Sequence, residues 1–341
     1  MLTLVFIVAT FLILIFPHEF GHFLSAKASG MKVEKLSIGF GPKIWGKKIG
    51  DTEYLISVFP LGGYTKIAGM EPGEKHVKNG FSSKSLWKRI VVILSGSGMN
   101  YLTSAFLFSL IFIIGFETYN LETTVVGEVI TGSPAASVGL KPGDKILEIN
   151  GKKVTKWEQM AIFINKEREE TLTLRIKRGE NILTVPVKPK FNSELNRRLI
   201  GISPSTIITR YDPLTSFSKG IERVVFVTRL IISSLGNMIV GRLPAKFTGP
   251  IGIAGYISQT AKMGIVPFLS LAALLGVNLG LLNLFPIPAL DGGRLVFLLI
   301  EGIRGKPIQI EKEALVHYIG FIILITLMLL VTYQDILRMV K

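Results

Sequence analysis

His18-Glu19-Phe20-Gly21-His22 is the stretch that decides the fold, because it directly follows an uncharged, almost wholly apolar run from Leu2 to Phe16. On a helix, residues four apart share a face, so both histidines point the same way with Glu19 beside them. Such a pair offers two nitrogen ligands to one zinc ion and leaves the glutamate free as a general base. Ionisable groups inside a membrane span are costly and usually functional. The stretch therefore predicts a zinc half-site on a membrane helix, in preference to a chance pattern.

The composition is that of a membrane protein. The 341 residues are 48% hydrophobic, with mean hydropathy +0.47, which indicates several membrane spans. The absence of cysteine excludes disulfides and thiol catalysis. A net charge of +15 raises nucleic acid as a partner, but 12 Lys/Arg face only 5 Asp/Glu between Lys27 and Arg89. Such a loop is typical of the cytoplasmic side of an anionic membrane. We therefore expect the lipid bilayer, and no nucleic acid, as a partner.

Four apolar runs are long enough to cross a bilayer, which takes about 20 residues. We expect a polytopic α-helical membrane protein with about four transmembrane helices, at Leu2–Ala26, Ile90–Phe116, Met263–Leu290 and Ala314–Gln334. The N-terminus lacks a basic region and a small-residue cleavage site, so the first run is expected to be retained. The charge rule places loop 27–89 in the cytoplasm, and the segment between the second and third spans outside.

A fifth apolar stretch, residues 221–241, is predicted to lie in the membrane interface. It carries Glu222, Arg223 and Arg229 at helical spacing, which favours an amphipathic helix over a span. A fifth span would also carry Asp291 to the opposite side of the membrane from the histidine motif.

The loop from Met31 to Met70 alternates glycine with β-forming residues, which predicts short strands and hairpins in a membrane-associated β-hairpin region. An edge of such a sheet could pair with an extended substrate strand, with Gly62 and Gly63 as contacts. An ordinary cytoplasmic hairpin explains the pattern equally well.

Residues 127–154 leave the membrane pattern and resemble a bacterial-type PDZ domain that ends near Pro189. Ser133 can open a short helix, and residues 142–144 make a turn before a strand at 145–150. Further strands are expected at 171–176 and 182–187. This α+β domain is predicted to be extracytoplasmic and to bind chain ends or act as a steric gate.

A third zinc ligand is expected from Asn283-Leu-Phe-Pro-Ile-Pro-Ala-Leu-Asp-Gly-Gly. Asp291 closes an uncharged run, and two prolines are expected to break the helix just before it. The two glycines after it allow the backbone to turn the carboxylate back; the alternative is an interfacial helix cap. His317 has no partner at ligand spacing and is expected to be a packed or interfacial residue and not a ligand. His76 lies in a polar loop and receives no role.

Together, these motifs resemble the site-2 protease family of intramembrane zinc metalloproteases, in its bacterial RseP-like group. The resemblance implies a multi-pass protein of the bacterial inner membrane that cleaves single-span proteins, such as anti-sigma factors or remnant signal peptides. It implies zinc ligands His18, His22 and Asp291, the catalytic base Glu19, and substrate contacts at Asn278, Asn283 and Pro286. The glycine-rich motif at 95–100 has Ser97 where the family has proline, and the chain has one PDZ domain where the best-known members have two.

The expected organisation has four parts: helices with the hairpin loop (1–120), the PDZ domain (121–190), a linker with the interfacial helix (191–262), and the last two spans (263–341). No obligate protein partner is inferred. Two other functions stay open. A metal-binding transporter would need a series of ionisable residues across the spans, and the second run has none. A non-catalytic PDZ scaffold would leave the zinc half-sites unexplained.

Overall fold

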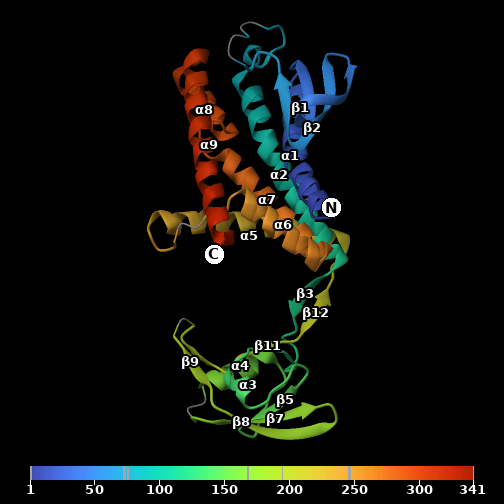
Figure 1. The fold of residues 1–341 in the computed structure, drawn as a ribbon, viewed down its shortest axis with the longest axis vertical. Coiled ribbons are helices and arrows are strands. Elements are labelled where there is room, and N and C mark those ends of the chain that lie inside the picture. The colour runs from blue at the N-terminus through green and yellow to red at the C-terminus, as the bar shows by residue number, and fades with distance from the viewer. Residues whose placement is uncertain are drawn as a thin grey trace. The chain divides into compact units, whose positions relative to one another are not determined.

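The computed structural model describes residues 2–71, 74, 77–166, 169–193, 195–244 and 247–340, so His76 lies outside the described residues. The chain forms two compact units (Figure 1). One combines residues 1–114 with 211–341, and the other is Gly115–Arg210.

The first unit is a helical bundle with one small sheet. Four of its helices are long and apolar enough to cross a membrane, as judged over the described residues, which agrees with the expected number. These are α1 (Leu2–Ala28), α2 (Leu86–Ile114), α7 (Ile265–Leu284) and α9 (Ile310–Val340). The remaining helices are η1 (Phe81–Ser83), α5 (Pro213–Ile239), α6 (Pro250–Met263) and α8 (Asp291–Arg304).

Helix α2 stands at the centre of this bundle and packs against α1, α5, α7 and α8. Its buried face combines apolar residues with Gly96, Ser97, Asn100 and Ser104. Small residues on such a face let neighbouring helices approach closely. The second helix is therefore the element that joins the two halves of the site.

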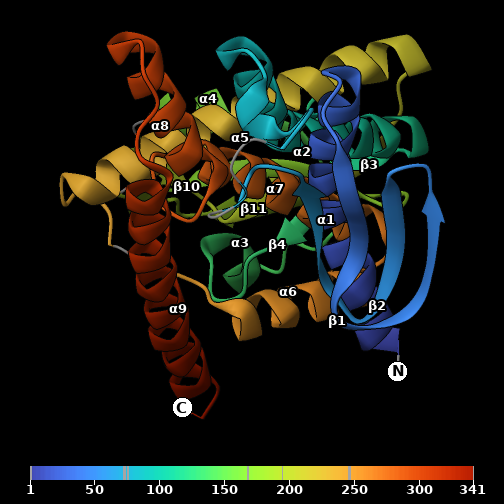
Figure 2. The same cartoon turned by 90° about the horizontal axis from the view of Figure 1, so that it is seen from above.

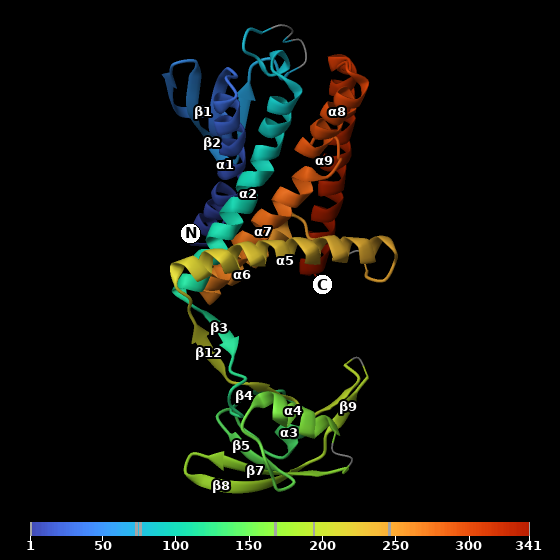
Figure 3. The same cartoon turned by 180° about the vertical axis from the view of Figure 1, so that it is seen from behind.

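Helix α5, which contains most of the 221–241 stretch, runs across α2 and α7 and not alongside them (Figure 3). It is not among the four candidate spans. At the crossing with α2 the two helices are so close that residue 220 must be glycine, because a Cβ there would lie 2.3 Å from Ser109 Oγ. Its other faces expose large apolar side chains such as Phe217 and Phe226.

The predicted hairpin region forms two long, bent strands, β1 (Val33–Ile49) and β2 (Thr52–Ile67). Repeated register shifts let residues 35–38 pair with both 53–56 and 63–66. The sheet lies along α1, on the side of the bundle away from α9 (Figure 2). Thr65 Oγ1 donates a 2.8 Å hydrogen bond to the backbone oxygen of Glu19, which fixes the second strand against the histidine motif.

The second unit has its own apolar core around a four-stranded sheet of order β6-β5-β7-β8. Ser133 caps the short helix α3, as its sequence predicts, by accepting from the Ala136 N–H. The unit extends past residue 190, because strands in 197–209 pair back onto earlier ones. Its elements are β3 (Phe116–Tyr119), β4 (Val126–Val129), α3 (Pro134–Ser137), β5 (Lys145–Ile149), β6 (Lys152–Lys153), α4 (Trp157–Lys166), β7 (Leu172–Arg178), β8 (Asn181–Val187), β9 (Lys190–Asn192), β10 (Arg197–Leu199), β11 (Ile202–Pro204) and β12 (Thr206–Thr209).

The third apolar run is broken by proline before Asp291, as its sequence predicts. Its helix α7 begins at Ile265 and ends at Leu284, so the last residues before Asp291 form a turn and not a helix. Prolines at 286 and 288 explain the early end, because neither can donate to a helix hydrogen bond. Before it lies α6, a separate helix that the hydropathy pattern does not show. Pro250 at its start is a typical first helical residue.

Candidate metal centre

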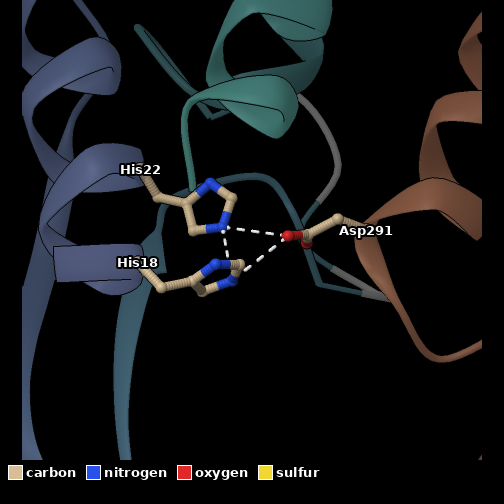
Figure 4. Close-up of side chains that lie close together, drawn as sticks. All are labelled: His18, His22 and Asp291. Atoms are coloured by element: carbon tan, nitrogen blue, oxygen red, sulfur yellow. Dashed lines mark hydrogen bonds and ion pairs between the residues drawn. The ribbon is translucent and has the colours of Figure 1, made fainter. Parts of the chain in front are cut away.

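Two segments far apart in the sequence bring three ligand atoms together. Helix α1 supplies His18 and His22, and the N-terminus of α8 supplies Asp291 (Figure 4). Oδ2 of Asp291 lies 3.2 Å from Nε2 of each histidine, and the two Nε2 atoms are 3.2 Å apart. The three atoms therefore form a nearly equilateral triangle.

This triangle has the size that a tetrahedral zinc ion requires. Bonds of about 2.0–2.1 Å at tetrahedral angles separate the ligand atoms by about 3.3 Å. Protonation supports the same conclusion. Nδ1 of His22 lies 2.8 Å from the carbonyl oxygen of Val92, so Nδ1 carries the proton and Nε2 presents a lone pair. Oδ2 of Asp291 is buried without a hydrogen-bond donor among the described residues. Lone pairs that converge in this way fit a bound cation.

Helix α2 holds the two imidazoles from behind. Its Val92 carbonyl orients His22, and Nδ2 of Asn100 lies 3.4 Å from Nδ1 of His18. Partners of this kind fix the ring orientation of metal-binding histidines. Gly96 lies between them, and a Cβ there would come within 2.3 Å of His22 Nε2. The metal site therefore depends on a helix that supplies none of its ligands.

The turn before α8 presents Asp291 to the histidines. Ala289 has φ of 77°, a left-handed conformation that a residue with a side chain rarely adopts. Gly292 packs under the same turn, where a Cβ would lie 2.0 Å from the Phe285 carbonyl oxygen. Glycine at this position lets the chain fold tightly enough to bring the carboxylate back toward α1.

Glu19 lies on α1 between the two histidines and next to the second strand. A Cβ on Gly63 would lie 3.5 Å from Glu19 Cγ. Gly63 is thus placed beside the expected base. Gly62 instead packs against the ring of Phe40, where a Cβ would overlap the ring atoms.

The other expected substrate contacts lie in the second half of α7 and in the turn that joins α7 to Asp291. Asn278 is half-buried within α7, Asn283 is half-buried near its end, and Pro286 is exposed in the turn that follows. Among the hydrogen bonds of the described residues, neither asparagine side chain has a partner. Both amides are therefore available to another chain.

Two residues of the site receive no role from sequence reasoning. Gly96 and Asn100 belong to the glycine-rich motif at 95–100, but the pattern does not show that they face the histidines. Their spacing of four residues on one helix face is the signal that could have found them.

The geometry is that of a candidate metal site held by a bundle whose helices include four long and apolar enough to cross a membrane, as judged over the described residues. The model of peptidase family M50 matches residues 6–327, so the chain belongs to this family, which confirms the expected site-2 protease resemblance. It is a zinc metalloprotease, as the motif predicts.

Several curated proteins are similar over nearly their whole length. The "Regulator of sigma-W protease RasP" of Bacillus subtilis is 31% identical, over 99% of this chain and 99% of its own. A "Putative zinc metalloprotease" of Clostridium acetobutylicum is 34% identical, over 98% and 97%. The crystal structure of a PDZ domain from an SdrC-like protein of Listeria monocytogenes covers 26% of this chain and 92% of its own, at 24% identity and a TM-score of 0.23. A score of this size does not define a fold, so the PDZ interpretation rests on the sequence pattern.

Proposed function

We propose that this protein hydrolyses peptide bonds within the transmembrane segments of single-span membrane proteins. In this proposal His18, His22 and Asp291 hold the zinc ion, and Glu19 is the catalytic base. The 3.2 Å triangle of ligand atoms on α1 and α8 is the observation that carries it.

The chemistry follows from the placement of these side chains. Zinc supplies Lewis acidity, which polarises the scissile carbonyl and makes water a nucleophile at neutral pH. Glu19 accepts the proton of the attacking water and passes it to the leaving amine. It is free for this because it is not part of the ligand cluster among the described residues. During this proton transfer, the hydrogen bonds from α2 to His18 and His22 hold the two imidazoles in a fixed orientation.

The substrate must be extended where it is cut, because a helix hides its peptide bonds in its own hydrogen bonds. A strand laid beside the 59–64 segment would pass Gly63 and so lie next to Glu19. The half-buried amides of Asn278 and Asn283 would hold its other side. The name of the Bacillus subtilis relative supports regulators of a sigma factor as one substrate class, and remnant signal peptides are the second.

We place the protein in the cytoplasmic membrane of a bacterium, with loop 27–89 inside and the 115–210 unit outside. The excess of basic residues in that loop supports this orientation. Helix α5 would then lie in the outer interface, with its exposed apolar side chains in lipid. Thiol labelling tests this orientation directly, because the chain has no cysteine of its own that would react. In intact cells an impermeant thiol reagent should label Asn150→Cys but not Pro60→Cys, and the reverse result would overturn the orientation.

Cleavage of a defined substrate tests the function itself. The purified protein, reconstituted with zinc in vesicles, should cut a single-span protein with a short outer tail, and mass spectrometry should place the cut within the apolar segment. The Glu19→Gln variant is the matched control and should be inactive. Cuts confined to the soluble tail, or equal cutting by the variant, would rule the proposal out.

A further inference from the structure

The turn that presents Asp291 is held from the side by the last helix. The N–H of Ala289 donates a 2.8 Å hydrogen bond to Nδ1 of His317, in the first half of α9. Ala289 is the residue with φ of 77°, two positions before the carboxylate. The strained residue of the turn is therefore the one that His317 contacts.

A second contact on the same face of α9 seats the residue before it. Gly320 follows His317 by three positions, which places both on one side of the helix. A Cβ on Gly320 would lie 2.4 Å from Pro288 Cβ and 2.7 Å from the Pro288 carbonyl oxygen. Pro288 thus rests directly on the backbone of α9. Together, the two contacts fix Pro288 and Ala289 from one direction.

We propose that His317 is a positioning residue for the metal site, which acts by holding Ala289 in its left-handed conformation. A residue with a Cβ relaxes toward negative φ unless its surroundings hold it. Relaxation at Ala289 would rotate the chain that leads into α8 and move the Asp291 carboxylate away from the histidines. The hydrogen bond to Nδ1 opposes this rotation.

The geometry of His317 fits positioning and not metal binding. His317 is not part of the ligand cluster found among the described residues. Because its Nδ1 accepts from the Ala289 N–H, the ring proton sits on Nε2. Nε2 lies 3.9 Å from Oε1 of Glu313, one turn earlier on the same helix. Nε2 is buried and has no hydrogen-bond partner among the described residues, whereas Nδ1 is taken by the Ala289 N–H.

The zinc dissociation constant of the purified full chain, measured by chelator competition, tests this role without using activity. His317→Leu removes the acceptor and should weaken zinc binding roughly tenfold, the usual effect of an unpaired buried donor. His317→Asn keeps an acceptor near Nδ1 and should restore most of the affinity. Tyr318→Leu, on the exposed side of the same helix, is the matched control and should bind as the parent does.

A double-mutant cycle with Ala289→Gly separates positioning from general damage to α9. Glycine adopts positive φ without strain, so the turn should keep its shape without the hydrogen bond. In the Ala289→Gly background, His317→Leu should therefore cost no more than about threefold, a clear departure from additivity. An equal loss in both backgrounds would overturn the proposal, as would unchanged affinity for His317→Leu.

Gly320→Ala provides an independent variant, because its methyl group would displace Pro288. It should weaken zinc binding even if His317→Leu does not accumulate, and parent-like affinity would count against the proposal. The inference rests on the proposed ligand role of Asp291, so Asp291→Ala is measured in parallel. Full zinc affinity in that variant would refute the ligand role itself, whatever the result at His317.

Discussion

At the scale of single residues, the candidate metal site requires glycine where α2 closely approaches the histidine side chains. Gly96 lies behind both imidazoles, and the place where its Cβ would sit is within 3 Å of atoms of His18 and His22. Gly98, two residues further along α2, is exposed and would meet nothing within 4 Å. The two glycines differ only in what they face, so they form a natural pair for comparison.

Gly96→Ala should therefore abolish tight zinc binding, because the added methyl group must push His22 off its position. We expect a loss of about 100-fold or more in zinc affinity, at the upper end of effects from groups behind metal ligands. Gly98→Ala should bind zinc as the parent does and should stabilise α2 slightly, because alanine favours helix. Equal affinity for the two variants, measured by chelator competition, would contradict the close contact.

The sequence predicts the expected zinc ligands better than it predicts the residues that hold those ligands in position. His18, Glu19 and His22 follow from helical spacing alone, and Asp291 follows from the need for a third ligand. The supporting contacts come from α2 and α9 and join residues between 28 and 82 positions apart in the sequence. Periodicity says which face of a helix is apolar, but not which neighbour it meets. For that reason the spacing of Gly96 and Asn100 could indicate a shared helix face but not its contact with the histidines, and nothing in the pattern indicates the contact of His317 with Ala289.

At the scale of elements, the helices follow their hydropathy, and the departures have local causes. The end of α7 at Leu284 agrees with the predicted proline break, whereas Pro250 starts a separate helix, α6, before the apolar run that is predicted to begin at Met263. The strands of the hairpin region were expected as short pieces. They form two long bent strands instead, because bulges let one segment pair on both sides.

In the 115–210 unit, an ion pair ties the turn before β5 to the end of β7. Asp144 is buried and accepts from Nε and Nη2 of Arg178 at 2.7 Å, and from the Lys141 N–H. Burial alone would raise the pKa of Asp144, but these hydrogen bonds lower the pKa below its usual range. A carboxyl group with a lowered folded-state pKa stabilises the fold above its unfolded pKa, about 3.9, and loses this effect as the pH falls further.

This unit should therefore lose stability as the pH falls below about 4, and Asp144→Asn should remove that part of the loss. Near neutral pH the variant should be less stable than the parent, and the difference should stay constant down to about pH 4 and shrink as the pH falls further. Hydrogen exchange of the β7 amides in the full chain, corrected for the intrinsic pH dependence, measures both. A difference that stays constant over the whole pH range would show that the ion pair does not titrate in this range.

At the scale of the whole molecule, the 115–210 unit is an insertion between α2 and α5. Its first and last strands pair with each other, and Tyr119 lies opposite Thr206. Just outside it, the Tyr211 N–H donates to the Phe112 carbonyl oxygen at 3.0 Å. The chain can therefore be rejoined across β3 and β12 without a long linker.

We predict that the unit filters substrates and takes no part in catalysis. Replacing residues 120–205 with a two-residue Asn-Gly turn should leave the helices and zinc binding intact, because such a turn joins paired antiparallel strands. Cleavage of short-tailed substrates should persist, and cleavage of a substrate with a folded outer domain should rise. Loss of short-tailed cleavage by a variant that still binds zinc would instead mean that the unit recruits substrate.

The central claim is that His18, His22 and Asp291 hold zinc while Glu19 performs the proton transfer. Zinc content and cleavage, measured on the same purified samples, test it most directly. Glu19→Gln should keep one zinc per chain and lose cleavage, whereas Asp291→Ala should lose both, because two protein ligands do not suffice for such a site. Full zinc occupancy in Asp291→Ala, or cleavage by Glu19→Gln, would contradict the account.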